Sequence, residues 1–302
     1  MAFPAASGYG NLPLGNFSPV IYSKKVLNFF KTVSIVDEIT NTEFEGEINQ
    51  MGDTVRILKA PEVTVTTYTR GKQLTSQDLN DEDLSMVIDQ AYAYQFQIDD
   101  IEKKQSHVGW AEMSKGNAAY KLRDTYDQNV FAAILAGATT QSATGTSGSE
   151  ADIGYTAGAD FTPLNLINRL ARYLDDNSVP DDGGRWFTAK PQFYETLGQE
   201  DSKYIEANTM GDAESFIRQR KLGAKNIAGF SCYKSINVPL NANSKPTALA
   251  GHISAVATAK NILISETVRS TATFADIYRG LFVFGRKVLR REALFAANIN
   301  FL

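Results

Sequence analysis

The sequence contains few of the residues that disulfides, metal sites and nucleophilic catalysis require. Its 302 residues include one cysteine, Cys232, and two histidines, His107 and His252. A single cysteine excludes a disulfide within the chain, which fits folding in a reducing cytoplasm. The two histidines are far apart in the sequence, and neither has the spacing of a zinc site or a catalytic triad. We interpret Cys232, in a strand-like run, as a small buried apolar residue.

Membrane and secretory features are also missing. No stretch approaches the ~20 consecutive apolar residues that a membrane helix needs, and residues 1–6 lack the basic start and apolar core of a signal peptide. We therefore expect a soluble protein with no membrane partner. The net charge of -4 and the pI near 5.4 argue against a dedicated nucleic-acid binder, which is normally basic.

Motifs for cofactors and catalysis are absent as well. The sequence has no G-x-G-x-x-G or G-x-S-x-G motif, and Gly71-Lys72 is followed by Gln73, not by the Ser or Thr of a phosphate-binding loop. The acidic clusters at 37–38, 81–83 and 99–100 lack the twelve-residue calcium-loop pattern, so we interpret them as solvated surface. The sequence predicts no catalysis, no cofactor and no metal.

The most informative pattern that is present is a pair of long extended segments. Residues 53–59 read as a strand that ends before Pro61, and Val63, Val65 and Thr67 continue the alternation. Residues 85–98 then alternate between a large apolar face and a polar or small one. Two such strands joined by a polar loop predict a projecting hairpin, which is marginally stable alone and needs a surface to lie on. That surface is either a neighbouring molecule or the chain's own domain.

A long helix is predicted over residues 110–136, because apolar residues recur at spacings of three and four while the opposite face is charged. The apolar face is Ala119, Leu122, Tyr126, Val130, Ala133 and Ile134, and the polar face is Lys121, Arg123, Asp124, Asp127 and Gln128. Residues 137–160 have the composition of a linker. They mark the clearest domain boundary in the sequence.

The pattern after residue 160 is mixed. Thr162 and Pro163 are a helix cap and first helical residue, followed by an apolar stripe at Ile167, Leu170, Ala171 and Leu174. Further elements are expected at the following positions: strands at 185–189, 225–236, 281–289 and 294–301, and helices near 191–197, 212–217 and 248–260.

In this order of features the chain resembles the major capsid proteins of tailed bacteriophages, which have the Hong Kong 97 fold. The residues that carry the resemblance are Gly52-Asp53-Thr54-Val55, the return strand 84–101, the long helix, Asp175-Asp176-Asn177-Ser178-Val179-Pro180, Gly184-Arg185-Trp186, Pro191-Gln192-Phe193-Tyr194, Ile227-Ala228-Gly229-Phe230, Tyr233-Lys234-Ser235, Val238-Pro239, Gly280 and Phe284-Gly285-Arg286-Lys287. The resemblance covers the chain from about residue 17 to residue 302.

The resemblance implies an α+β capsid fold with five regions. These are an N-terminal arm (1–50), an extended E-loop (51–90), a P-domain with a long spine helix (91–160, plus part of the C-terminal segment), an A-domain (161–285) and a C-terminal strand that returns to the P-domain (286–302). It also implies self-assembly into hexamers and pentamers of an icosahedral shell, in the host cytoplasm, around packaged double-stranded DNA. A scaffolding protein, a portal and a decoration protein are the other expected partners.

In such a shell the E-loop reaches over the adjacent subunit, so the candidate contact residues are Arg70, Lys72, Asp78 and Asp81. The basic run 286–291 favours a subunit contact or a shell-lining face. Two alternatives remain: an encapsulin-like shell of a bacterial compartment, which has the same fold, and a cytoplasmic α/β enzyme.

Overall fold

The computed structural model describes residues 34–44, 52–59, 63–71, 73, 76–77, 82–105, 110–141, 150–155, 159–198 and 227–301. The helices among them are α1 (Val36–Ile39), α2 (Asp100–Gln105), α3 (Trp110–Gly137), α4 (Pro163–Asp176) and α5 (Pro191–Leu197). The strands are β1 (Thr54–Lys59), β2 (Glu82–Val87), β3 (Gln90–Asp99), β4 (Thr139–Gln141), β5 (Ala151–Ile153), β6 (Arg185–Ala189), β7 (Ser231–Lys234), β8 (Thr247–His252), β9 (Val256–Arg269), β10 (Ala275–Val288) and β11 (Leu294–Phe301).

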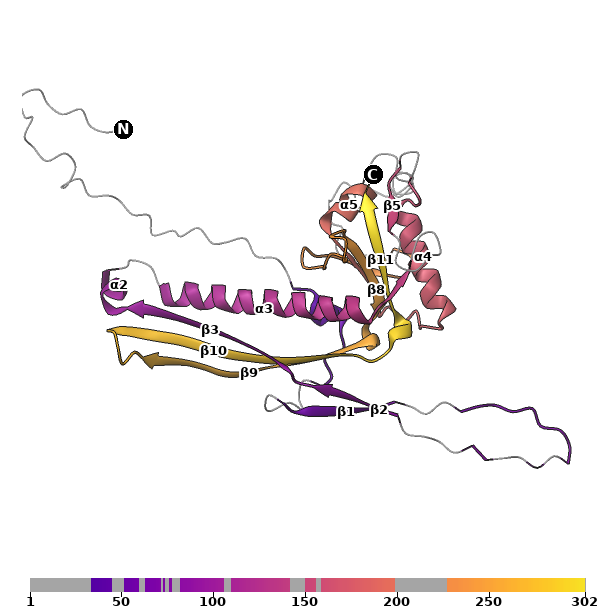
Figure 1. Cartoon of the computed structure of the whole chain (residues 1–302), viewed down its shortest axis with the longest axis horizontal. Helices are drawn as coiled ribbons and strands as arrows, with labels where there is room; N and C mark the ends of the chain where they lie inside the picture. The colour runs from indigo at the N-terminus through magenta and orange to yellow at the C-terminus, as the bar shows by residue number, and fades with distance from the viewer. Residues whose placement is uncertain are drawn as a thin grey trace, which may run out of the picture.

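One part of the molecule is elongated and is built on α3. This helix runs along a three-stranded sheet of order β3-β10-β9, in which both strand pairs are antiparallel (Figure 1). Tyr126 of α3 packs edge-on against Phe282 and Phe284 of β10, with ring centroids 5.9 and 5.0 Å away. The helix and sheet therefore share an aromatic cluster at this point.

The long helix was predicted correctly, and its buried stripe includes Tyr126, Val130 and Ile134 as expected. Two residues of the predicted pattern differ. Ala119 is exposed, whereas Asp127, expected on the charged face, is only 1% exposed. Asp127 is buried because α1 packs across that side of the helix and Ser34 donates a hydrogen bond to its carboxylate at 2.7 Å. The N-terminal segment thus covers a face that helical periodicity alone assigns to solvent.

The predicted return strand is in fact two strands in different sheets. β2 pairs antiparallel with β1, from Thr54↔Val87 to Lys59↔Glu82, whereas β3 pairs with β10. The large side chains of β3 are covered by their own chain: Tyr92 stacks on Phe284, and Phe96 stacks on Tyr278. The β1–β2 hairpin projects from the sheet (Figure 1), whereas residues 90–99 lie on the chain's own domain, so the prediction of a single long return strand was wrong.

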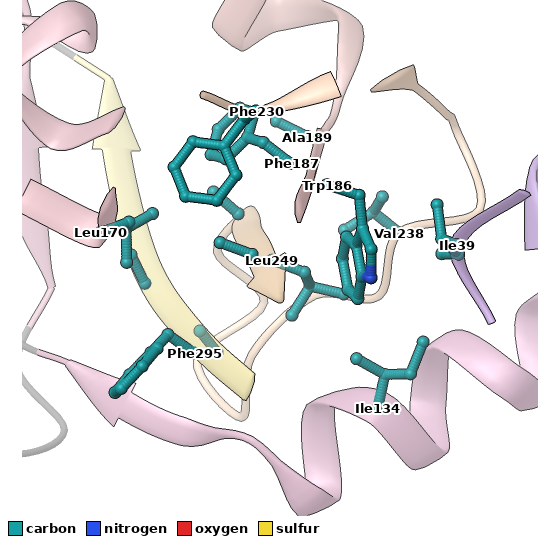
Figure 2. Close-up of a cluster of buried hydrophobic side chains, with 14 of the residues drawn as sticks. Ile39, Ile134, Leu170, Trp186, Phe187, Ala189, Phe230, Val238, Leu249 and Phe295 are labelled. Atoms are coloured by element: carbon teal, nitrogen blue, oxygen red, sulfur yellow. The ribbon is translucent and has the colours of Figure 1, made fainter. Parts of the chain in front are cut away.

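The second part of the molecule contains a sheet of order β4-β11-β8-β6-β7, with β5 paired to β11. The predicted helix start is confirmed, because Thr162 Oγ1 accepts a hydrogen bond from the Asn165 backbone nitrogen at 3.3 Å and Pro163 opens α4. Figure 2 shows the core around Trp186, with Ile39 from α1 and Ile134 from α3 pointing toward it. All three are buried, so one apolar core joins the two parts.

Strand pairing groups the C-terminal segments differently from the expected boundaries. β9 and β10 pair with β3 in the elongated part, although most of both lies in the expected A-domain range 161–285. β11, expected to return to the P-domain, pairs instead with β8 in the second part. The helix expected at 248–260 is also wrong. Ala248, Ala250, Ala257 and Ala259 are fully buried in β8 and β9, where small side chains fit between crowded layers.

The expected linker 137–160 is not wholly irregular, because β4 and β5 lie in it and pair in parallel with β11. The helix expected near 212–217 lies outside the described residues. The same holds for most of the N-terminal arm, of which residues 34–44 are described. No helix of the described part is long and apolar enough to cross a membrane.

Candidate intersubunit surfaces

The β1–β2 hairpin is anchored at its base and exposed beyond it. Val55, Met86 and Ile88 are buried in a small cluster with Ala257, Ala259 and Val283 of β9 and β10. Two backbone hydrogen bonds close the base, Gly52 N to Ile88 O at 3.0 Å and Ile88 N to Asp53 O at 3.1 Å. The base is therefore fixed to the elongated part, and the direction in which the hairpin leaves it is set by packing.

Beyond the paired strands the hairpin carries exposed apolar side chains. Val63 is 66% exposed, Val65 is 92% exposed and Tyr68 is 62% exposed. The two arms of this loop approach each other, since the Thr64 backbone nitrogen donates to Gln77 Oε1 at 2.9 Å. Three large apolar side chains on one projecting loop are unusual for a surface that faces only water. This loop is the leading candidate for a contact surface.

Of the predicted contact residues, the structure describes only Arg70. It is exposed in the turn of the loop, next to Gly71, whose φ of +85° favours glycine. Lys72, Asp78 and Asp81 lie outside the described residues. The sequence reasoning selected charged residues and did not single out Val65 and Tyr68 as contacts, although the alternation at Val63 and Val65 was already visible.

A second surface lies at the far end of the elongated part, where four charged side chains meet. Arg269 pairs with Asp100 and with Asp276, the latter at 3.1 Å, and Lys103 pairs with Asp276 at 2.8 Å. The hydrogen bond from Arg269 lowers the pKa of Asp100, and those from Lys103 and Arg269 lower the pKa of Asp276. The hydrogen bond to Asp276 raises the pKa of Lys103. The network ties α2 to the ends of β9 and β10.

The buried carboxylate of Asp127 is the main electrostatic anomaly of the interior. Its burial raises its pKa from 3.8 to about 6, while the hydrogen bond from Ser34 acts in the opposite direction. Asp37 of α1 raises it further, and Arg123 lowers it. Because Ser34 and Asp37 both precede the hairpin, this site links the N-terminal segment to α3.

The structure brings together one constellation that the sequence did not reveal. His252 contacts Asp182 through Nε2 at 2.9 Å and Ser254 Oγ through Nδ1 at 2.8 Å. The Ser254 backbone nitrogen also donates to Nδ1, at 3.2 Å, so His252 caps the 3-10 turn η2 (Ile253–Ala255). The histidine is 7% exposed, and the contacts hold this turn against the loop of Asp182. We interpret the constellation as structural.

Other chemistry finds little support among the described residues. Cys232 is buried, and burial raises the pKa of its thiol to about 11, which suppresses the reactive thiolate. No group of three or more metal-ligating side chains occurs in the part of the chain that the structure describes. His107 lies outside it.

Comparison with known proteins identifies the fold. No family model and no curated protein matches the sequence. A solved chain from Mycobacterium phage Che8 is similar over 95% of this chain and 98% of its own, with 25% identity and a TM-score of 0.77. A chain from the capsid of Cyanophage P-SCSP1u shares 17% identity over 96% and 95% of the two chains, with a TM-score of 0.73. A chain from the mature capsid of bacteriophage PhiM1 shares 16% over 93% and 91%, with a TM-score of 0.67.

The mixed helix and sheet architecture is thus that of phage capsid subunits, over nearly the whole chain. The resemblance predicted from the sequence is confirmed. Two of these neighbours are chains of phage capsids. The similarity extends over almost the full length of each neighbouring chain.

Proposed function

We propose that the chain is the major capsid protein of a tailed bacteriophage and assembles into the shell that encloses the double-stranded DNA genome. The observation that carries the proposal is the projecting loop with Val63, Val65 and Tyr68 exposed. Burial of one such side chain contributes about 1.5–3 kcal/mol. A neighbouring copy of the chain that covers all three side chains would therefore stabilise the contact between the two copies by several kcal/mol.

We assign the parts as follows. The hairpin from β1 to β2 is the E-loop, and it lies on an adjacent subunit. The P-domain comprises α3 as spine helix with β3, β9 and β10, and the A-domain comprises α4, α5 and the sheet that contains β11. These bounds replace the division at residues 285 and 286, because they follow the strand pairing.

The remaining partners follow from the same role. Hexamers and pentamers of the chain form an icosahedral shell in the host cytoplasm, with a scaffolding protein, a portal and a decoration protein as companions. Contact with DNA is non-specific, in keeping with the net charge of -4. Arg70, Lys72, Asp78 and Asp81 remain proposed contacts of the E-loop.

The test is assembly of the purified protein with and without the exposed loop. We expect the full chain to form closed particles in electron microscopy. Replacement of residues 63–77 by a short Gly-Ser turn keeps β1, β2 and their buried base. The resulting variant should remain folded by circular dichroism but form no shells. Normal assembly of this variant would overturn the E-loop assignment, and catalytic turnover by a monomer would revive the enzyme alternative.

A single substitution sharpens the test. Val65→Asp places a charge at the most exposed apolar side chain among the described residues of the loop, where we expect little effect on the isolated fold. We expect it to prevent or strongly weaken assembly, because the contact would then bury an unpaired carboxylate. Val65→Ile is the matched control, since it keeps the apolar β-branched shape and should assemble like the wild type.

A further inference from the structure

The segment around α1 lies where elements that are distant in the sequence meet. The Thr258 backbone nitrogen of β9 donates to the Asn41 carbonyl oxygen at 2.9 Å, so the segment lies against one edge of that strand. Ile39 of the same segment points toward Trp186 in the core of the second part (Figure 2). We call residues 34–41 the clasp, because they join the elongated part to the second part of the molecule.

The clasp is also tied to α3 and β9 through charged side chains. Asp37 pairs with Lys260 of β9 at 2.5 Å and with Arg123 of α3 at 3.5 Å. Ser34 donates a hydrogen bond to Asp127 of α3 at 2.7 Å, and Asp127 is only 1% exposed. Both cations therefore pair with Asp37, and no ion pair to Asp127 occurs among the residues that the structure describes.

Negative charge is in excess around this contact. The titratable groups of the elements that meet at the clasp are Arg123, Asp124 and Asp127 of α3, Asp37 and Glu38 of α1, Lys260 of β9 and Tyr233 of β7. Burial, with Asp37 and Asp124 beside it, raises the pKa of Asp127 to about 6 against the opposing contributions of Ser34 and Arg123. Because the pKa is raised when the clasp covers the carboxyl group, the clasp binds best below about pH 4 and loses this advantage as the pH rises through 6.

We propose that the clasp is closed most firmly while Asp127 carries a proton, and that it opens more readily when this carboxyl group is ionised. Ionisation leaves a buried charge without a paired cation, which is costly. Opening the clasp relieves that cost, because Ser34 and α1 are the groups that cover the carboxylate. The pH would thus set how firmly the two parts of the molecule are joined. The inference concerns the single subunit and does not rest on the proposed shell function.

The test is amide hydrogen exchange of the purified full-length subunit at about pH 4.5 and about pH 7.5, on either side of the pKa of Asp127. Asp127→Asn keeps an acceptor for Ser34 but cannot ionise, and comparison with it at the same pH cancels the pH dependence of the exchange chemistry. Relative to this variant, opening of residues 35–41 should become more than about tenfold more frequent in the wild type over this range. The amide of Thr258 should follow, because it donates to Asn41.

A matched control separates Asp127 from the other carboxyl groups. Asp124→Asn removes one carboxylate from the same helix and leaves Asp127 in place, so it should keep the pH response of the wild type. An equal pH response in the wild type and in Asp127→Asn would overturn the proposal. Loss of the response in Asp124→Asn would overturn the assignment to Asp127.

A second variant changes the position of the response and leaves the carboxyl group intact. The hydrogen bond from Ser34 lowers the pKa of Asp127, so Ser34→Ala should move the response to higher pH. Acrylamide quenching of Trp186 fluorescence, in a Trp110→Phe background, gives a readout that does not depend on exchange chemistry, since Ile39 points toward Trp186. A response of Ser34→Ala that moves to lower pH, or quenching that is independent of pH in the wild type, would contradict the proposal.

Discussion

A substitution that adds one methyl group, Gly285→Ala, tests how the β1–β2 hairpin is attached to the sheet. Gly285 of β10 lies under the junction between β2 and β3, and a Cβ added there would approach the Val87 carbonyl oxygen and Ile88 Cδ1, both to 2.7 Å. It would also approach Ile88 Cα to 3.2 Å. Two of these atoms belong to the backbone, so no side-chain rotation relieves the overlap. Gly285→Ala must displace the base of the hairpin.

The expected size of the effect follows from two opposing contributions. Overpacking of a well-packed site costs about 1–3 kcal/mol, and the loss of glycine's freedom in the unfolded chain offsets about 0.4–1 kcal/mol. We therefore expect the free energy of unfolding to fall by about 1–2 kcal/mol. The disturbance should be local, with faster amide hydrogen exchange in residues 82–88 than elsewhere in the sheet.

Denaturant titration and hydrogen exchange together check this prediction. Gly116→Ala is the matched control, because Gly116 lies within α3 with no atom within 4 Å of the added Cβ. The control should stabilise the protein by about 0.5–1 kcal/mol through helix propensity. If Gly285→Ala is as stable as the wild type and exchange at 82–88 is unchanged, the hairpin base is not packed as described.

Three further predictions concern the interior. The raised pKa of Asp127, about 6, means that the folded protein binds this proton more readily than the unfolded chain, so the free energy of unfolding should fall by up to about 3 kcal/mol as the pH rises from about 4 through 6. Asp127→Asn should remove that part of the pH dependence in denaturant titrations, and equal slopes for the two proteins would refute it. Arg185, 3% exposed, donates to the carbonyls of Val179 and Pro180 and pairs with Asp175 at 2.7 Å. Arg185→Ala removes the donor to these carbonyls and should cost about 1–3 kcal/mol by thermal or chemical unfolding, whereas Asp175→Asn, at an exposed carboxylate, should cost less than about 1 kcal/mol. Cys232 should resist alkylation in the native protein at mildly alkaline pH and react after unfolding, which mass spectrometry can follow.

Local signals in the sequence were sufficient for α3, α4 and α5. The stripe at Tyr126, Val130 and Ile134 and the cap at Thr162 with Pro163 depend on neighbours within one or two turns, so their structural outcome follows the pattern directly. The class of fold was predictable for a different reason, because many weak features occurred in a specific order. Neither the local patterns nor the order of features shows which strands pair when they are far apart in the sequence.

Long-range pairing accounts for the errors. Residues 85–98 alternate with one interruption, at Gln90, yet the chain changes partner at Ile88, from β1 to β10, because Gly285 allows β10 to pass close beneath that point. The run 248–260 is rich in alanine and favours a helix by propensity, but β8 and β9 place those small side chains between buried layers. Asp127 was assigned to solvent because α1, which covers it, is distant in sequence.

The projecting loop combines a fixed base with exposed apolar side chains, and this combination bears on assembly. Its base is packed against β9 and β10, whereas Val63, Val65 and Tyr68 farther along the loop are exposed. A contact that is ordered before binding fixes the angle between its partners, whereas a contact made by an extended loop adapts to the surface that it meets. If the chain has the proposed shell function, the loop would therefore supply burial that tolerates a change in the angle between neighbouring copies.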